Sequence, residues 1–99
     1  MTITKTQAEA AEVLTLTGRI DTVTAPKLQE DLLEAVSSSE SVVLDFADVD
    51  YVSSAGLRVI LIGQKRAQGT GKTMTLKNVP REVMEVFEIT GFSDILTFA

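Results

Sequence analysis

"SVVLDFADVDYVSSAGLRVILIG", Ser41 to Gly63, contains the two patterns that define an α/β fold. Residues 41–49 are rich in β-branched residues and apolar on both sides, which is typical of a central, parallel strand covered on its faces. We expect this strand to end near Asp45 and to lead into a loop. From Ala55 to about Gln68 the apolar residues recur at helical spacing, and glycines at 69 and 71 are candidate stops. The inward stripe of this helix is expected at Leu57, Ile60, Leu61 and Gln64.

The residues before this stretch predict a hairpin and a helix. "EVLTLTG" (12–18) alternates with period two, which places Leu14 and Leu16 on one face until Gly18 breaks the run. "TITKT" (2–6) is expected to pair with it as an edge strand. In the helix that follows, Thr24 is the expected N-cap, Pro26 lies in the first turn, and the serines at 37–39 end it. Its apolar positions are Leu28, Leu32, Ala35 and Val36.

The residues after it continue the alternation of strands and helices. "TMTLKN" (73–78) predicts a strand with Met74 and Leu76 facing inward, and Pro80 opens a third helix with an apolar stripe at Val83, Val86 and Phe87. "GFSDILTF" (91–98) predicts a turn and a last short strand. The order β-β-α-β-α-β-α-β implies one α/β domain over residues 1–99, with a mostly parallel sheet, crossover helices and an N-terminal hairpin.

Composition excludes several classes of function. The 99 residues include no cysteine and no histidine, which removes thiol chemistry, the commonest general base and the usual zinc sites. The net charge of -5 argues against nucleic acid and acidic membranes as partners. The longest apolar run, residues 59–62, is far too short to span a bilayer, and no secretory signal is visible at the start. We therefore expect a cytoplasmic protein without a cofactor or a metal.

Ser53 and Ser54 lie in the loop after the central strand, where α/β folds usually place their ligands. If Ala55 is the first helical residue, Ser54 is the N-cap, and its hydroxyl accepts a hydrogen bond from the first turn. Capping alone is one interpretation of this serine. The other is a chemical role, since a phosphate at a helix N-terminus is electrostatically favoured.

The residues that follow Ser54 bear on this choice. Ala55 and Gly56 leave little side-chain bulk beside the hydroxyl, although Gly56 could equally serve close packing against another element. Arg58, four residues on, could reach a phosphoserine or a partner's carboxylate, or could be a solvated arginine. Val59 and Ile62 point away from the expected stripe, and the sequence does not decide whether they meet a second layer or form a contact patch.

"LTLTGRIDTVTAPKL" followed by "VVLDFADVDYVSSAGLRVIL" resembles the STAS-domain family, in particular the bacterial anti-sigma factor antagonists. The resemblance extends to the closing "EVFEITGFSDILTF". It implies a partner-switching protein that binds an anti-sigma factor, itself a serine kinase with a histidine-kinase-like ATPase fold, and displaces the sigma factor. The kinase releases the antagonist by phosphorylating it, and a PP2C-type phosphatase restores it.

The same resemblance assigns roles to individual residues. The phosphoacceptor is Ser54. Partner contacts are expected from Asp21 and Thr22 in the loop before the first helix, although Asp21 is also a natural turn residue. The other expected contacts are Ser53, Ala55, Gly56, Leu57 and Arg58. The chain departs from sporulation-type antagonists at Ser53, where they carry aspartate, and at Arg58, where they carry a small residue, whereas a related subgroup reads "SSAGLR".

The sequence leaves two other functions open. The chain could be a constitutive STAS subunit of a lipid-transport or stress-signalling complex, without a switch. It could also be an enzyme, either a receiver-like phosphoacceptor using Asp45 or Asp48 or a small hydrolase. The receiver lacks an acidic pair after the first strand, and "SSAGL" is not the Gly-x-Ser-x-Gly elbow of α/β-hydrolases. We therefore expect a binding module and not an enzyme.

Overall fold

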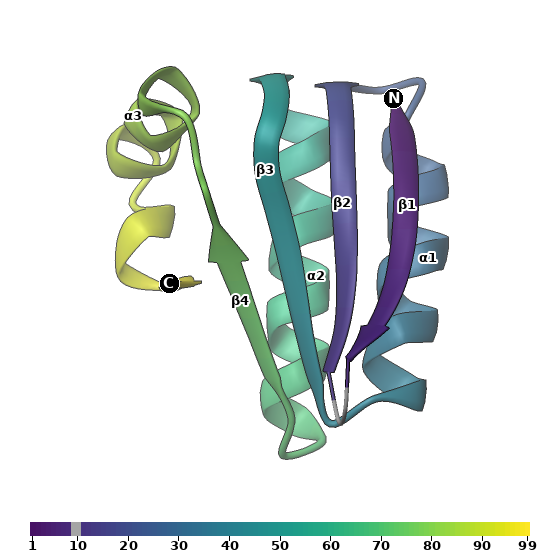
Figure 1. Cartoon of the computed structure of the whole chain (residues 1–99). Helices are drawn as coiled ribbons and strands as arrows, with labels where there is room; N and C mark the ends of the chain where they lie inside the picture. The colour runs from purple at the N-terminus through teal and green to yellow at the C-terminus, as the bar shows by residue number, and fades with distance from the viewer. Residues whose placement is uncertain (9–10) are drawn as a thin grey trace.

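The computed structural model describes residues 1–8 and 11–99, whose five strands form one sheet in the order β1-β2-β3-β4-β5. The β1–β2 pair is antiparallel and the other neighbours are parallel, as the sequence predicts. Figure 1 shows α1 and α2 side by side behind the sheet, with α3 beside the end of β4. The elements are β1 (Thr2–Ala8), β2 (Ala11–Ile20), α1 (Ala25–Ser38), β3 (Ser41–Val52), α2 (Ser54–Gly69), β4 (Thr73–Lys77), α3 (Arg81–Ile89), the 3-10 turn η1 (Phe92–Asp94) and β5 (Thr97–Phe98).

The core lies between the sheet and its helices. Leu14, Leu44 and Leu76, which pair across β2, β3 and β4, are fully buried, as the alternation predicts for β2 and β4. The expectation that β3 is covered on both faces is wrong. The opposite face is only half-buried at Val13 and Val43, which are cross-strand partners. The apolar residues on that face therefore cover one another and do not lie beneath a second layer of helices.

Strands β2 and β3 are longer than the sequence suggests. β2 does not stop at Gly18 but continues to Ile20, and β3 does not end near Asp45 but runs to Val52. Register shifts between β2 and β3 interrupt the period-two pattern, and Gly18 has a φ of 97°, which favours glycine. The bulges made a continuous strand resemble a polar loop.

Helix α2 packs closely on α1 along a face that the sequence only partly predicted. Leu57, Ile60 and Gln64 are buried as expected, but Val59 is buried in place of Leu61, which is half-buried. The two helices can approach closely because Gly63 has no Cβ. An added Cβ there would meet Leu32 Cδ2 and Cγ of α1 at less than van der Waals distance.

A buried acid ties the edge strand β1 to α1. Asp31 is only 4% exposed, although it is charged, and its carboxylate lies 3.4 Å from Lys5 Nζ of β1 and 3.3 Å from Lys27 Nζ. Desolvation, the largest effect on Lys5, lowers its pKa, but Asp31, Glu34 and Glu12 together raise the pKa above its ordinary value of 10.5. An inward-facing charged pair of this kind also disfavours pairing of the exposed strand edge with another chain.

Candidate functional site

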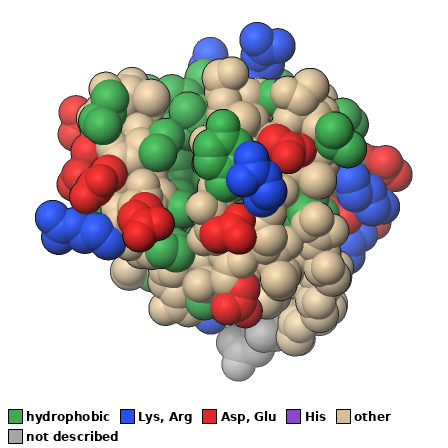
Figure 2. All heavy atoms as spheres, turned by 90° about the horizontal axis from the view of Figure 1, so that it is seen from above, with side chains coloured by type: hydrophobic (Ala, Val, Ile, Leu, Met, Phe, Trp, Pro, Cys, Tyr) green, Lys and Arg blue, Asp and Glu red, His purple; other side chains and the backbone are tan. Residues whose placement is uncertain are grey.

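The candidate site lies at the sheet edge where β2 and β3 end and α2 begins, at the top of Figure 1. Only Ser53 separates Val52, the last residue of β3, from the helix, so the expected loop is a direct strand-to-helix turn. The Ser53 N–H donates to the Ile20 carbonyl over 2.8 Å, which joins the turn to the end of β2. Figure 2 shows this end of the molecule, where hydrophobic side chains lie among acidic and basic ones.

The two serines have different positions from those expected. Ser53, not Ser54, is the N-cap, and its Oγ accepts a hydrogen bond from the Gly56 N–H over 3.3 Å. Ser54 is the first helical residue and is exposed. The helix begins one residue earlier than predicted, because either serine could cap it.

The first turn of α2 leaves two amides free for an external group. The Ser53 and Gly56 N–H groups are satisfied, but within the described residues no protein group accepts from the N–H of Ser54 or Ala55. The first turn contains no acidic residue. Together with the helix dipole, these donors favour a negative charge beside the Ser54 hydroxyl.

Gly56 and Leu57 support the site from the core side. A Cβ on Gly56 would lie 2.7 Å from Ile20 Cγ2 and 3.0 Å from Val52 Cγ1, so the helix start packs directly onto the ends of β2 and β3. The close-packing interpretation of Gly56 is therefore confirmed. Leu57 is 8% exposed and belongs to the core. Neither residue presents a side chain at the surface.

Asp21 organises the loop before α1. Its Oδ1 accepts hydrogen bonds from the N–H groups of Val23 and Thr24, and its Oδ2 lies 3.7 Å from Arg19 Nε. The hydrogen bond from the Thr24 amide is the largest effect, and with the other donors and Arg19 it outweighs desolvation, so the pKa of Asp21 lies below its ordinary value of 3.8. Thr24 occupies the N-cap position but makes no capping bond; its Oγ1 accepts instead from the Asp21 N–H and donates to the Arg19 carbonyl.

A shallow groove joins this loop to α2. It encloses about 200 Å³ between the N-terminal halves of α1 and α2 and is lined by Thr22, Ala55 and Arg58, among others. The structure thus brings together three of the predicted contact residues from two separate parts of the chain. Arg58 is exposed and lies one helical turn after Ser54.

Two exposed residues at this edge were missed by the sequence analysis. Val23 is 86% exposed in the Asp21 loop, and Tyr51 near the end of β3 is 42% exposed. The Arg19 guanidinium carbon lies 4.2 Å from the centre of the Tyr51 ring, a cation–π distance. An apolar valine inside the polar turn "DTVT" was the available signal for the first, whereas Tyr51 was hidden by the misplaced end of β3.

Some types of site are absent from the described part of the chain. Across residues 1–8 and 11–99, no three acidic, histidine or cysteine side chains come together as metal ligands. Within the same residues, no helix has the length and apolarity needed to cross a bilayer.

Comparison with known proteins places the chain in a family. The family model described as "Mlab, STAS domain" matches residues 3–97. BtrV of Bordetella bronchiseptica, a candidate anti-sigma factor antagonist, is 35% identical over 100% of this chain and 86% of its own length. The anti-sigma-B factor antagonist of Bacillus subtilis is 31% identical over 82% of this chain and 74% of its own. The chain therefore belongs to the STAS-domain family, as its motifs suggested.

Two solved structures of one protein, in different phosphorylation states, share the fold of this chain. The phosphorylated form of SpoIIAA, a Bacillus cell fate determinant, superposes with a TM-score of 0.77 at 15% identity, covering 99% of this chain and 91% of that one. The unphosphorylated form of the antagonist SpoIIAA gives 0.78 at 13% identity, covering 99% and 87%. At this level of identity the likeness concerns the fold alone.

Proposed function

We propose that this chain is an anti-sigma factor antagonist controlled by phosphorylation of Ser54. In its unphosphorylated form it binds an anti-sigma factor that is also a serine kinase, and phosphorylation releases it. The observation that carries the proposal is the exposed Ser54 hydroxyl at the first position of α2, beside a serine that already caps the helix. Two relatives support the same function, since one is named as an anti-sigma-B factor antagonist and the other as a candidate anti-sigma factor antagonist.

Ser54 is the better acceptor of the two serines on physical grounds. The Ser53 hydroxyl is half-buried and occupied by the Gly56 amide, so phosphorylating it would cost the helix its cap. The Ser54 hydroxyl is exposed. A phosphate there would face two free amides, the positive end of the helix dipole and Arg58 one turn away. Ser54 can therefore gain about -1.5 to -2 charges without disturbing the fold.

The surface offered to the kinase combines the α2 start with the Asp21 loop. Its exposed or half-exposed members are Asp21, Thr22, Ser53, Ala55 and Arg58, around the acceptor. Gly56 and Leu57 act from beneath by holding the helix against β2 and β3. A phosphate in the middle of this surface would oppose binding by charge, bulk and desolvation.

The remaining parts of the proposal follow the family pattern. A PP2C-type phosphatase would remove the phosphate and restore binding. The chain acts as a single STAS domain in the cytoplasm, as a regulatory binding module and not as an enzyme. A constitutive subunit of a transport or stress complex is less well supported, because the relatives described above are named as antagonists.

The test is phosphorylation by the anti-sigma factor kinase isolated from the cell that makes this protein. We expect one phosphoryl group per wild-type chain by intact mass, none on Ser54→Ala, and one on the matched Ser53→Ala. Wild-type and Ser54→Ala chains should bind the kinase, and Ser54→Asp should not. A phosphoryl group retained on Ser54→Ala and lost on Ser53→Ala would move the acceptor to Ser53.

Two further results would contradict the proposal. Unchanged kinase affinity of Ser54→Asp would favour the constitutive subunit, because a regulated surface should respond to the added charge. Amide NMR shifts spread far beyond the start of α2 on phosphorylation would refute a local switch. We expect the shifts to stay within the first turns of α2 and the neighbouring Asp21 loop.

A further inference from the structure

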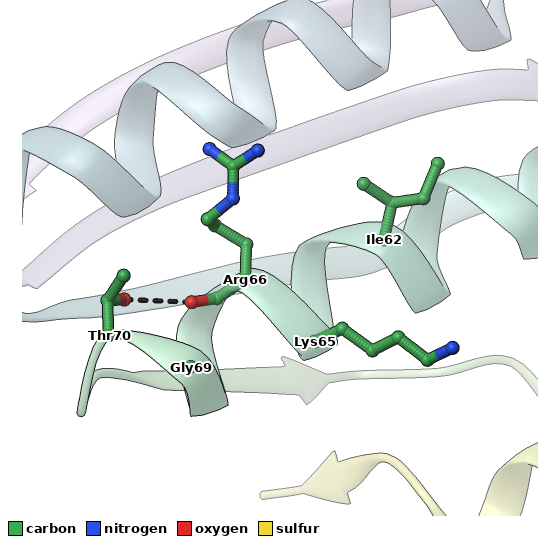
Figure 3. Close-up of a pocket in the computed structure, with 5 residues that line it drawn as sticks. All are labelled: Ile62, Lys65, Arg66, Gly69 and Thr70. Atoms are coloured by element: carbon green, nitrogen blue, oxygen red, sulfur yellow. Dashed lines mark hydrogen bonds between the residues drawn. The ribbon is translucent and has the colours of Figure 1, made fainter.

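The C-terminal half of α2 has a hollow on its outer face that the proposed kinase surface does not use. Ile62, Lys65, Arg66, Gly69 and Thr70 line it, and it encloses about 410 Å³. Figure 3 shows Ile62 and Arg66 projecting to the same side of the helix. An added Cβ on Gly69 would meet nothing within 4 Å, so the hollow is open to a side chain from outside.

The rim of this hollow carries positive charge that no ion pair within the described residues neutralises. α2 contains three cations and no acidic residue, in a chain whose net charge is -5. Among the described residues, neither Lys65 nor Arg66 takes part in an ion pair. The repulsion between these adjacent like charges is offset when an anion lies near both of them. The hollow therefore favours an apolar side chain that is flanked by acids.

Helix α3 of the same chain presents that combination. Ile89, at its last position, is 85% exposed, and Glu85 lies four residues earlier on the same side of the helix, with Glu88 three residues after Glu85. Glu85 pairs only with Arg81, over 3.5 Å, in the described part of the chain. A lone exposed isoleucine is ordinary. The two surfaces of this molecule are complementary: α3 has an isoleucine flanked by acids, and α2 has an apolar hollow flanked by cations.

We propose that α3 of one copy docks into the α2 hollow of a second copy, with Ile89 against Ile62 and Gly69. Glu85 and Glu88 would then face Lys65 and Arg66. Residues 85–89 of α3 span about 6 Å of helix, which fits within the roughly 10 Å that residues 62–69 of α2 span. A second copy fits better than nucleic acid or an anionic membrane, because the net charge of -5 opposes both. The inference goes beyond the proposed function and does not depend on it.

The contact is heterologous, since a different surface of each copy takes part. One copy keeps a free hollow and the other keeps a free α3, so the association can extend beyond a dimer. The surfaces are small and their charges exposed, so we expect a Kd of about 0.1 to 1 mM in low salt. In about 0.5 M NaCl the affinity should fall several-fold, because exposed pairs are screened.

The first experiment is sedimentation equilibrium of the full chain from about 0.05 to about 2 mM in low salt. Wild type should associate with increasing concentration. The hollow variant Lys65→Glu/Arg66→Glu and the α3 variant Glu85→Lys/Glu88→Lys should each stay monomeric. The control Glu30→Lys/Glu40→Lys changes charge by the same amount as the α3 variant at two exposed sites off both surfaces. It should associate like wild type.

The decisive step is to mix the two monomeric variants. The hollow variant keeps a native α3 and the α3 variant keeps a native hollow, and the two reversed surfaces also carry opposite charges, so an equimolar mixture should associate beyond a dimer as wild type does. This result also shows that both variants are folded. In amide NMR, the mixing should shift residues 62–70 and 81–89 of both variants.

Several outcomes overturn the proposal. One is a wild type that stays monomeric at about 2 mM. Another is association that persists when the hollow variant and the α3 variant are each tested alone. A third is a mixture of the two variants that remains monomeric. Binding to phosphatidylglycerol vesicles that is lost in Lys65→Glu/Arg66→Glu, without self-association of wild type, would assign the hollow to a membrane instead. None of these measurements uses the kinase, so their failure is distinct from a failure of the Ser54 assignment.

Discussion

Replacing Gly56 with alanine tests whether close packing positions the start of α2. The new Cβ would lie 2.7 Å from Ile20 Cγ2, 3.0 Å from Val52 Cγ1 and 3.0 Å from the Ile20 carbonyl oxygen. That oxygen accepts the Ser53 N–H over 2.8 Å, so the backbone of β2 cannot move away without loosening the turn. Relief must come from a shift of the whole helix start.

Two opposing effects set the size of the change. Overpacking of a tight core costs about 1 to 3 kcal/mol. Alanine recovers up to about 1 kcal/mol over glycine through its helix propensity, and less than that in the first turn. We therefore expect Gly56→Ala to lower the free energy of unfolding by about 1 to 2 kcal/mol. For a domain of this size that lowers Tm by roughly 5 to 15 °C.

Gly69→Ala is the matched control because it makes the same change in the same helix. A Cβ at Gly69 meets nothing within 4 Å, so only the propensity gain remains, about 0.4 to 1 kcal/mol of stabilisation. Both variants are measured by urea denaturation, with the slope m checked against wild type. Opposite signs for the two glycines are expected. A Gly56→Ala chain as stable as Gly69→Ala would falsify the close-packing account.

Three further predictions concern single polar groups. Ser53→Ala should lower the free energy of unfolding by about 0.5 to 2 kcal/mol in urea denaturation, because it removes the cap, whereas an exposed serine should matter little. Because folding lowers the pKa of Asp21 below its ordinary value of 3.8, the ionised carboxylate stabilises the fold at pH values above 3.8. This contribution is lost as the pH falls through the folded pKa. Between about pH 5 and pH 2, wild type should therefore lose more stability than Asp21→Asn, and equal losses would exclude this role. Lys5→Met should lower the free energy of unfolding by weakening the pair with Asp31, and the loss should shrink in about 1 M NaCl.

Much of the fold could be predicted because its signals are local. Period two in β2 and β4 and helical spacing in α1 and α3 identified buried residues such as Leu14, Met74 and Phe87, although Val86 of the predicted α3 stripe is only half-buried. What failed depends on distant parts of the chain. The bulges between β2 and β3 are a property of the pair and not of either strand. The burial of Asp31 requires Lys5 from another element, and a charged residue in a helix otherwise predicts exposure.

The candidate site was predicted in its location but not in its detail. Ser53 and Ser54 are equivalent as caps in sequence terms, so the pattern alone could not choose the helix start. The choice depends on Gly56, which must face Ile20 and Val52 and thereby sets the rotation of the first turn. Once that rotation is set, Ser53 accepts from the Gly56 amide and Ser54 is exposed.

Ser53 caps α2 and Ser54 is exposed, which bears on the exchange at Ser53, where sporulation-type antagonists have aspartate. Serine and aspartate cap helices about equally well, so the exchange leaves the start of α2 intact. What it removes is a negative charge directly beside the proposed acceptor. With Arg58 one turn away, the surroundings of Ser54 are more positive than an aspartate would make them, which favours both the phosphate and an acidic contact. Under the proposed function, the departure would therefore change recognition by the kinase and the strength of the switch, and it would leave the start of α2 unchanged.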